Sequence, residues 1–448
     1  MASNVIDSEL YRGIYVNEEM KEIFSDESLL QKWLDSWVSL AQAEEDIGVI
    51  PMGMAEEIAK KANYENFDMD TIRKGLVDTT HPLIVQIREF TKNVGGKAGG
   101  YIHWGATTQD IMDTAVVLQI KEAQKLLLTQ MQKFLDTLLK LAREHEDTIM
   151  PGRTHGQHAL PITLGYKIAI WADEMGRHME RLKEGTKRYL MGSLSGAAGT
   201  LASISELGLS VQERYCKNLG LEQPTITWHV QRDGFAEFAS IIAMVSGTIG
   251  KIANEIINLQ KTEIGEIEEG FKMGQVGSST MPHKRNPMIC EYVVGLTRLV
   301  QRNASLGFDG MIQEHERDMT FWTTEWAYIP QICIFTSGGL EQMQGVLERF
   351  IVHKGNMERN LNLLQGLIVS ENLMLNLGES VGRQVAHDMV YKVSMQAFEE
   401  KRPLVDVVLE DNEIMAHISE EEVTDHLDPK HYIGLCSQFI DRVEKKWS

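Results

Sequence analysis

Residues 277–287, GSSTMPHKRNP, bring together groups that could hold an anion and move a proton. Two serine hydroxyls follow the first glycine, and the cations Lys284 and Arg285 stand just before an Asn-Pro pair. Because Asn is favoured at a helix N-cap and Pro at the first helical position, a helix is predicted to begin at Asn286-Pro287. Amide groups at a helix N-terminus attract anions. The run therefore predicts an anion-binding loop, although most Gly/Ser runs are only surface loops before a helix.

Two further polar stretches interrupt helical patterns and hold residues suited to chemistry. His155 lies in the stretch RTHGQH, and histidine suits proton transfer because its pKa lies near neutral pH. Thr107 and Thr108 lie in the stretch IHWGATTQD, just before a helical pattern begins. His155 and His158 form an HxxH pair, but no third zinc ligand is evident and Gly156 argues against a regular helix. We therefore predict no bound metal and no cofactor.

The acidic composition limits the classes of partner. The formal net charge is −20 and the pI is near 5.2, which argues against nucleic-acid partners and anionic membrane surfaces. A small anionic substrate stays compatible, because its site needs only local cations. The least polar run, residues 238–250, is too short for a membrane span. No signal-like stretch opens the chain and the four cysteines form no CxxC motif, so we expect a cytoplasmic protein with reduced thiols.

Low proline content and regular apolar spacing predict a mainly helical protein. The chain has 10 prolines in 448 residues and no sustained alternation typical of strands. Apolar residues recur at spacings of four and three from Leu127 to Leu141, which is typical of long packed helices. Further long helices are expected over residues 162–189, 234–263, from 287 onward, and 327–352.

The expected architecture has three parts. These are an N-terminal helical domain over residues 1–108, a central bundle of five long helices over 109–354 that forms the oligomerisation core, and a C-terminal helical domain over 355–448. The helix at 234–263 is nearly uncharged on every side through its first half, so it should be buried between subunits. Ser25 predicts a capped helix start, and residues 78–82 predict a helix break before a proline.

The run at 277–287 resembles the signature of the fumarase/aspartase superfamily, GSSxMPxKxNP. Its HKRNP ending is similar to the adenylosuccinate lyase and 3-carboxy-cis,cis-muconate cycloisomerase branch. Matching motifs fall near residues 79–110, 152–161, 231–233, 277–291 and 315–318. The resemblance implies an all-α, three-part fold around five long helices and a homotetramer with shared active sites. It also implies β-elimination by an adenylosuccinate lyase-like enzyme, which cleaves a C–N bond of an N-succinyl-type substrate and releases fumarate.

The resemblance assigns roles in proton transfer. Ser278 takes the place of the base, and Ser279 is the rival, although its more expected role is to donate a hydrogen bond to substrate. A serine hydroxyl is a poor base unless positive potential stabilises its alkoxide, which Lys284 could supply. His155 takes the place of the general acid that protonates the leaving nitrogen, and Glu291 takes the place of the carboxylate that orients it.

Other matching positions imply contacts with an anionic substrate. Lys284 and Asn286 match the residues that bind the carboxylate whose charge grows in the transition state. Thr107 and Thr108 match a pair that holds a substrate carboxylate, although both could instead cap a helix. The remaining matches to substrate contacts are His81, His103, Gln231 and Arg317. Arg317 could equally belong to a structural ion-pair network.

The chain departs from adenylosuccinate lyases where these hold the nucleotide phosphate. Trp326 stands in place of an Arg and Trp322 in place of a Ser, while Ile14 and Thr80 also replace arginines. Because indole cannot replace a bidentate Arg, we expect a leaving group other than AMP. Two arginines could compensate for these losses, namely Arg12 and Arg73.

Two alternatives remain open. A 3-carboxy-cis,cis-muconate cycloisomerase-like lactonising enzyme is favoured by the WGATTQD run and the Glu325-Trp326 pair. A catalytically silent structural relative, as in lens crystallins of this superfamily, is disfavoured because Ser278, His155 and Lys284 are all present.

Overall fold

The computed structural model describes residues 4–270 and 278–448. Helix accounts for 67% of it and strand for 4%, which confirms the all-α prediction. By compactness the chain divides into two units. Unit 1 contains Met1–Met131, His178–Ile249 and Gly295–Glu341, and unit 2 contains Gln132–Arg177, Gly250–Val294 and Gln342–Ser448. The three-part domain division at residues 108 and 354 stays a prediction.

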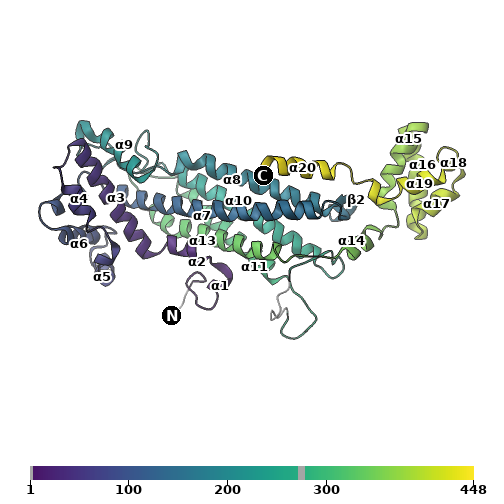
Figure 1. Ribbon diagram of the computed structural model, residues 1–448, viewed down its shortest axis with the longest axis horizontal. Coiled ribbons are helices and arrows are strands. Elements are labelled where there is room, and N and C mark those ends of the chain that lie inside the picture. Colours follow the sequence, from purple (N-terminus) through teal and green to yellow (C-terminus); the bar gives the residue numbers. More distant parts are fainter. Residues whose placement is uncertain (1–3, 271–277) are drawn as a thin grey trace. The chain divides into compact units, whose positions relative to one another are not determined.

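The described part of the chain contains the five long helices that were expected (Figure 1). They are α7 (Thr108–Glu144), α8 (Leu164–Tyr189), α10 (Asp233–Leu259), α11 (Met288–Ala304) and α13 (Trp322–Leu347). The apolar stripe predicted on α7 is buried, since Leu127, Met131 and Leu138 are all 0% exposed. Helix α13 begins at Trp322, earlier than the predicted 327, because Trp322 and Glu325 face buried polar partners described below.

Helix α10 is strongly apolar by composition. By length and composition alone it could cross a membrane, but 67% of its most apolar window is buried inside the structure. Phe238, Ile242 and Ile256 are each 0% exposed. A core helix passes the same composition test, so its burial explains the apolar run.

Among the described residues, unit 1 has eight further α-helices, four of which pack around an aromatic core. They are α1 (Arg12–Tyr15), α2 (Glu18–Ile23), α3 (Asp26–Ile47), α4 (Met54–Ala59), α5 (Met69–Thr79), α6 (Ile84–Val94), α9 (Gly208–Leu219) and α12 (Leu306–Asp309). The Ser25 hydroxyl accepts a hydrogen bond from the Ser28 amide, which confirms the predicted start of α3. Helix α5 ends at Thr79 with Thr80 in the left-handed region, which confirms the predicted break. The core includes Trp37 and Phe90.

Unit 2 contains strands that the sequence did not predict. Strands β1 (Ile149–Thr154) and β2 (Gln157–Thr163) form an antiparallel hairpin, and β3 (Ile267–Glu268) pairs with β4 (Ile351–Val352). The sequence of the hairpin does not alternate between apolar and polar residues, so it gave no strand signal. Two prolines, Pro151 and Pro161, lie opposite each other, and the register shifts between Pro151 and Arg153, which interrupts the alternation. Polar residues then fill its tip.

Short helices complete unit 2. They are α14 (Lys354–Leu361), α15 (Ser370–Val381), α16 (Arg383–Glu400), α17 (Leu404–Glu410), α18 (Asn412–Met415), α19 (Glu420–His426) and α20 (Cys436–Trp447). Ser419 and Glu422 form a reciprocal capping box that starts α19.

Candidate active site

His81 and Thr108 come together in unit 1. The His81 Nδ1 atom accepts hydrogen bonds from the amides of Leu83 at 3.2 Å and Ile84 at 3.1 Å, so it caps the start of α6. With Nδ1 used as an acceptor, the ring proton of neutral His81 lies on Nε2. That atom is 3.4 Å from the Thr108 hydroxyl, at the start of α7. Two residues predicted to contact substrate are therefore neighbours.

Asp110 fixes the loops around this pair, and sequence reasoning missed its role. Its carboxylate is 0% exposed. It accepts hydrogen bonds from the amides of Thr107, Ser195 and Gly196, each at 2.9 Å. The His229 Nε2 atom lies 2.7 Å from it. Asp110 thus joins the threonine pair to the loop that contains Ser195 and Gly196. The Thr-x-x-Asp spacing, typical of a helix cap, was the one sequence signal of this role.

His103 is held as a neutral hydrogen-bonding group. The Trp37 indole N–H donates to its Nδ1 at 3.1 Å. Burial lowers the pKa of His103 from 6.5 to about 4, despite the opposing charge of Asp110. At neutral pH its Nε2–H is therefore a donor without a positive charge, which suits a role in orienting substrate.

This burial predicts a pH effect on stability. Between pH 6.5 and about 4 the unfolded chain binds a proton that the folded His103 excludes, so stability falls as pH drops through that window, by up to about 3 kcal/mol. We expect His103→Asn to reduce this loss, because Asn keeps an acceptor near Nδ1, tolerates the left-handed backbone (φ 63°) and does not titrate. Unfolding midpoints at pH 7 and pH 5 measure the effect. An equal decline in both proteins would contradict it.

A buried ion cluster lies beside the predicted Gln231 position. Arg232 donates to Asp113 at 2.7 Å and also binds the Glu325 carboxylate, all three side chains being at most 2% exposed. Burial raises the pKa of Glu325 even against the charge of Arg232. The Trp322 indole donates to Asp113 at 2.8 Å. Trp322 therefore braces this cluster, which explains why it replaces a small hydroxyl residue.

Gln231 and Arg317 differ in their surroundings. Gln231 is exposed in the turn before α10. Arg317 is partly buried, and its Nε and Nη2 atoms are buried without a hydrogen-bond acceptor. The described residues give Arg317 no ion pair, so the alternative of a structural network is not found. A buried guanidinium edge without an acceptor is costly, which favours an anionic ligand there.

His155 occupies the tip of the β1–β2 hairpin in unit 2. His155 (φ 52°) and Gly156 (φ 77°) both adopt left-handed conformations, as a two-residue type I′ turn requires. The HxxH pair therefore lies on a hairpin, not on a helix. Close to the turn, Arg153 donates to the fully buried Glu266 at 2.9 and 2.6 Å, and Asn360 donates to the same carboxylate at 2.8 Å. This ion pair anchors the strand next to the exposed imidazole of His155.

The signature loop is described from Ser278 onward, and Gly277 lies outside the described residues. The Ser278 hydroxyl oxygen accepts a hydrogen bond from the Met281 amide at 3.0 Å. An amide donor favours the anionic form of the oxygen that it binds.

The other polar residues of the loop face solvent. Ser279 is exposed. The Lys284 ammonium is also exposed and has no acidic partner among the described residues, whereas Arg285 binds Glu268 at 2.8 Å.

Helix α11 begins within a residue of the prediction, but its N-terminus is not free. The Glu269 carboxylate accepts hydrogen bonds from the amides of Ile289 at 3.2 Å and Cys290 at 2.9 Å. The expectation that these amides would bind a substrate anion was therefore wrong, because the chain supplies its own carboxylate. Of the two cations before this helix, Arg285 is paired with Glu268, so Lys284 is the one whose charge can act on a substrate.

Glu291 and Asn286 complete the predicted set. Glu291 is exposed on the first turn of α11, and Asn286 is partly buried before it. In the described part of the chain, Glu291 forms neither a hydrogen bond nor an ion pair with His155. No group of three His, Cys, Asp or Glu side chains placed to hold a metal occurs among the described residues.

Known proteins match the chain along its length. A family model described as lyase matches residues 15–301, and one described as adenylosuccinate lyase C-terminus matches residues 366–443. The N-acetyl-S-(2-succino)cysteine lyase of Enterococcus italicus is 42% identical over 447 residues, 100% of this chain and 98% of that protein. An adenylosuccinate lyase of Methanocaldococcus jannaschii is 41% identical over 448 residues, 99% and 96% of the two chains. The 3-carboxy-cis,cis-muconate lactonizing enzyme from Pseudomonas putida superposes with a TM-score of 0.91 at 35% identity, covering 98% and 99%.

Proposed function

Because the chain is a lyase of the adenylosuccinate lyase family, we propose that it releases fumarate by β-elimination from a 2-succinylated amine or thiol that carries no nucleotide. One contrast supports the proposal. Lys284 and Arg317, which would bind the succinyl end, have no acidic partner among the described residues. The cations that could bind a phosphate are replaced or already paired.

Ser278 acts as the base in this proposal. It removes the proton beside a substrate carboxylate, and the Met281 amide on its oxygen lowers the cost of the alkoxide. Lys284 and Asn286 bind the carboxylate that gains charge, while Thr107 and Thr108 hold the second carboxylate. His81, His103, Gln231 and Ser279 orient the substrate, and Arg317 binds one of its anionic groups.

His155 gives its proton to the leaving heteroatom. Its exposed place at a hairpin tip lets it reach a substrate held by another chain, and Glu291 of such a chain would orient it. The candidate residues fall in both units, since His81 and Thr108 belong to unit 1 and Ser278 to unit 2. This arrangement and the apolar helix α10 support a homotetramer with sites shared between subunits as part of the proposal. The free cysteines, all buried, suit a cytoplasmic protein.

The leaving group is the point at which the chain departs from an adenylosuccinate lyase. The two arginines that could compensate for lost phosphate contacts both have acidic partners. Arg73 binds Asp70 at 2.6 Å, and Arg12 lies 3.6 Å from Glu18. A phosphate would have to displace a carboxylate to use either one. The Enterococcus relative is named for N-acetyl-S-(2-succino)cysteine, whose leaving group in a β-elimination would be N-acetylcysteine, a thiol without phosphate.

A panel of substrates tests the proposal. We expect fumarate, followed by its ultraviolet absorbance, from S-(2-succino) and N-(2-succino) compounds. The kcat/KM for adenylosuccinate should lie below about 10⁵ M⁻¹s⁻¹, since each lost charge-assisted contact is worth about 1.5–3 kcal/mol. A value at or above that limit would show that other residues hold the phosphate. The same panel should include a carboxymuconate, because the Pseudomonas lactonizing enzyme superposes closely. Lactone formation in place of fumarate release would favour this second candidate.

A further inference from the structure

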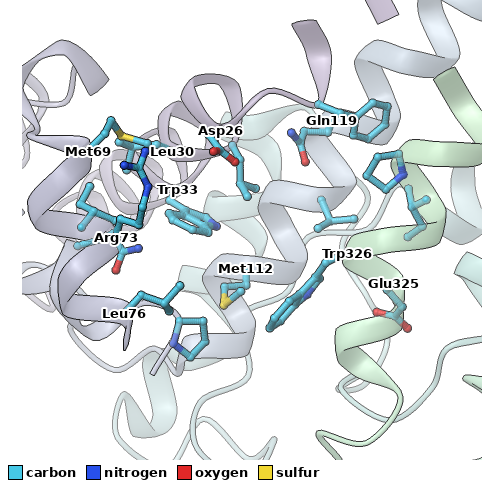
Figure 2. A pocket seen from close by; sticks show the side chains of 18 residues that line it. Asp26, Leu30, Trp33, Met69, Arg73, Leu76, Met112, Gln119, Glu325 and Trp326 are labelled. Atoms are coloured by element: carbon cyan, nitrogen blue, oxygen red, sulfur yellow. The ribbon is translucent and has the colours of Figure 1, made fainter. Parts of the chain in front are cut away.

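A cavity in unit 1 has no part in the chemistry described so far. Its volume is about 410 Å³, within the usual range for small-molecule sites, about 300–1,000 Å³. Side chains from α3, α5, α7 and α13 line it, and Figure 2 shows Trp33, Leu76, Met112 and Trp326 arranged around it. It is large enough for part of a substrate.

The cavity borders the residues proposed to hold the succinyl group. Its lining includes Pro82, which follows His81 directly in the chain. It also includes Met112, which lies one helical turn after Thr108 on the same face of α7. His81 and Thr108 are themselves 3.4 Å apart. A ligand whose reacting end lies at this pair can therefore place its other end in the cavity.

The charges around the cavity select the kind of ligand. Arg73 is the one cationic side chain among the lining residues and is bound to Asp70, whereas the exposed Asp26 brings a carboxyl group. The Glu325 carboxyl group is already paired with the buried Arg232. A phosphate or carboxylate in the cavity would meet Asp26 without a free cation. The remaining walls are mainly aliphatic and aromatic, and such walls favour apolar groups removed from water.

We propose that this cavity binds an uncharged, largely apolar tail of the leaving group, so that the preferred substrates are 2-succinylated thiols or amines bearing an acyl or aryl substituent. The inference rests on the proposed function and narrows its substrate class. Trp326 adds a flat apolar wall to the cavity at the position where adenylosuccinate lyases are expected to carry an Arg. The cavity should therefore select the leaving group by its size and hydrophobicity, and not by its charge.

A homologous series of substrates tests the tail. S-(2-succino)cysteamine would carry N-acetyl, N-butyryl or N-hexanoyl groups, with an adipoyl group as the matched anionic control. We expect kcat/KM to rise about fourfold for each added methylene until the cavity is filled. The adipoyl compound should lose most of the gain shown by the hexanoyl compound, because its terminal carboxylate would leave water for an apolar cavity that offers no free cation and has the Asp26 carboxylate in its lining.

Two neighbouring substitutions locate the effect. Leu76→Trp places an indole in the cavity, whereas Val77, its neighbour on α5, is 73% exposed and does not line it. Leu76→Trp should reduce the hexanoyl-to-acetyl ratio of kcat/KM at least tenfold, and Val77→Trp should leave that ratio unchanged. Circular dichroism of both variants checks folding.

The possible failures are distinguishable. Absence of fumarate from every compound would overturn the proposed elimination itself. Fumarate release with the same kcat/KM for all tails would overturn the cavity assignment while the elimination stands. Equal gains from hexanoyl and adipoyl tails would reject an uncharged ligand, and equal ratios in the two tryptophan variants would place the tail elsewhere.

Discussion

Ser278→Ala is expected to lower turnover by about three orders of magnitude or more, while fold and assembly stay unchanged. The substitution removes the hydroxyl that would take the substrate proton. It leaves the backbone of an irregular loop, and the hydrogen bonds lost among the described residues are those from the amides of Met281 at 3.0 Å and Thr280 at 3.4 Å. Steady-state fumarate release measures the effect, and sedimentation with circular dichroism confirms the assembly.

Ser279→Ala is the matched control for this loss. Ser279 lies beside Ser278 and is more exposed, and its expected role is to bind substrate. We therefore expect a smaller decrease in turnover, about tenfold, the loss of a single neutral hydrogen bond. If Ser278→Ala keeps more than a tenth of the activity and Ser279→Ala does not, the base is Ser279.

Arg232→Met should have the largest effect on stability, about 3–5 kcal/mol, because it leaves two buried carboxyl groups without their cation. Asp113 and Glu325 are both at most 2% exposed, and their ion pairs with Arg232 are fully buried. Methionine fills much of the volume, so the loss comes from uncompensated charge. Unfolding midpoints in urea measure it. Arg188→Met is the control, since its ion pair with Glu237 is partly exposed and should contribute at most about 1 kcal/mol.

The pH dependence of this variant gives a second readout. Burial already raises the pKa of Glu325 above its ordinary value, and loss of Arg232 removes the charge that opposes this shift. In the folded variant, Glu325 should keep its proton at pH values at which the unfolded chain has released it. The stability of the variant is therefore lost as pH rises through the pKa of Glu325 in the folded state, and it is recovered as pH falls toward the pKa of Glu325 in the unfolded chain. The deficit should be smaller at pH 5.5 than at pH 7.5. A deficit independent of pH would point to packing as its cause.

The fold was largely predictable where one short stretch of sequence carries the information. The apolar spacing along α7 and the Ser25 cap of α3 both depend on neighbours within a few residues, and both were correct. The β1–β2 hairpin was not predictable, because prolines and polar residues mask its alternation and a β-bulge shifts its register. The early start of α13 was missed for a different reason. Trp322 is fixed by Asp113, which is distant in sequence.

The same distinction applies to the site. Ser278, Lys284 and His155 stand in compact motifs, so their candidacy could be read directly. Asp110 and Arg232 bind partners about a hundred residues away, such as His229 and Glu325. Apart from the Thr-x-x-Asp spacing at Asp110, no local sequence pattern indicates these buried contacts. Glu269 was missed likewise, because only the folded chain brings it to the start of α11.

The left-handed turn at His155 bears on how such a protein can change over evolutionary time. Asn-Gly is the dipeptide best suited to a type I′ turn, so replacing His155 by Asn would leave the hairpin at least as stable. The buried pair of Arg153 and Glu266 would be untouched. A single substitution could thus abolish the proposed proton donor without harming solubility or folding. A lineage of this fold could therefore lose catalysis and persist as a binding or structural protein, whereas a change at Arg232 would lower the stability of the fold itself.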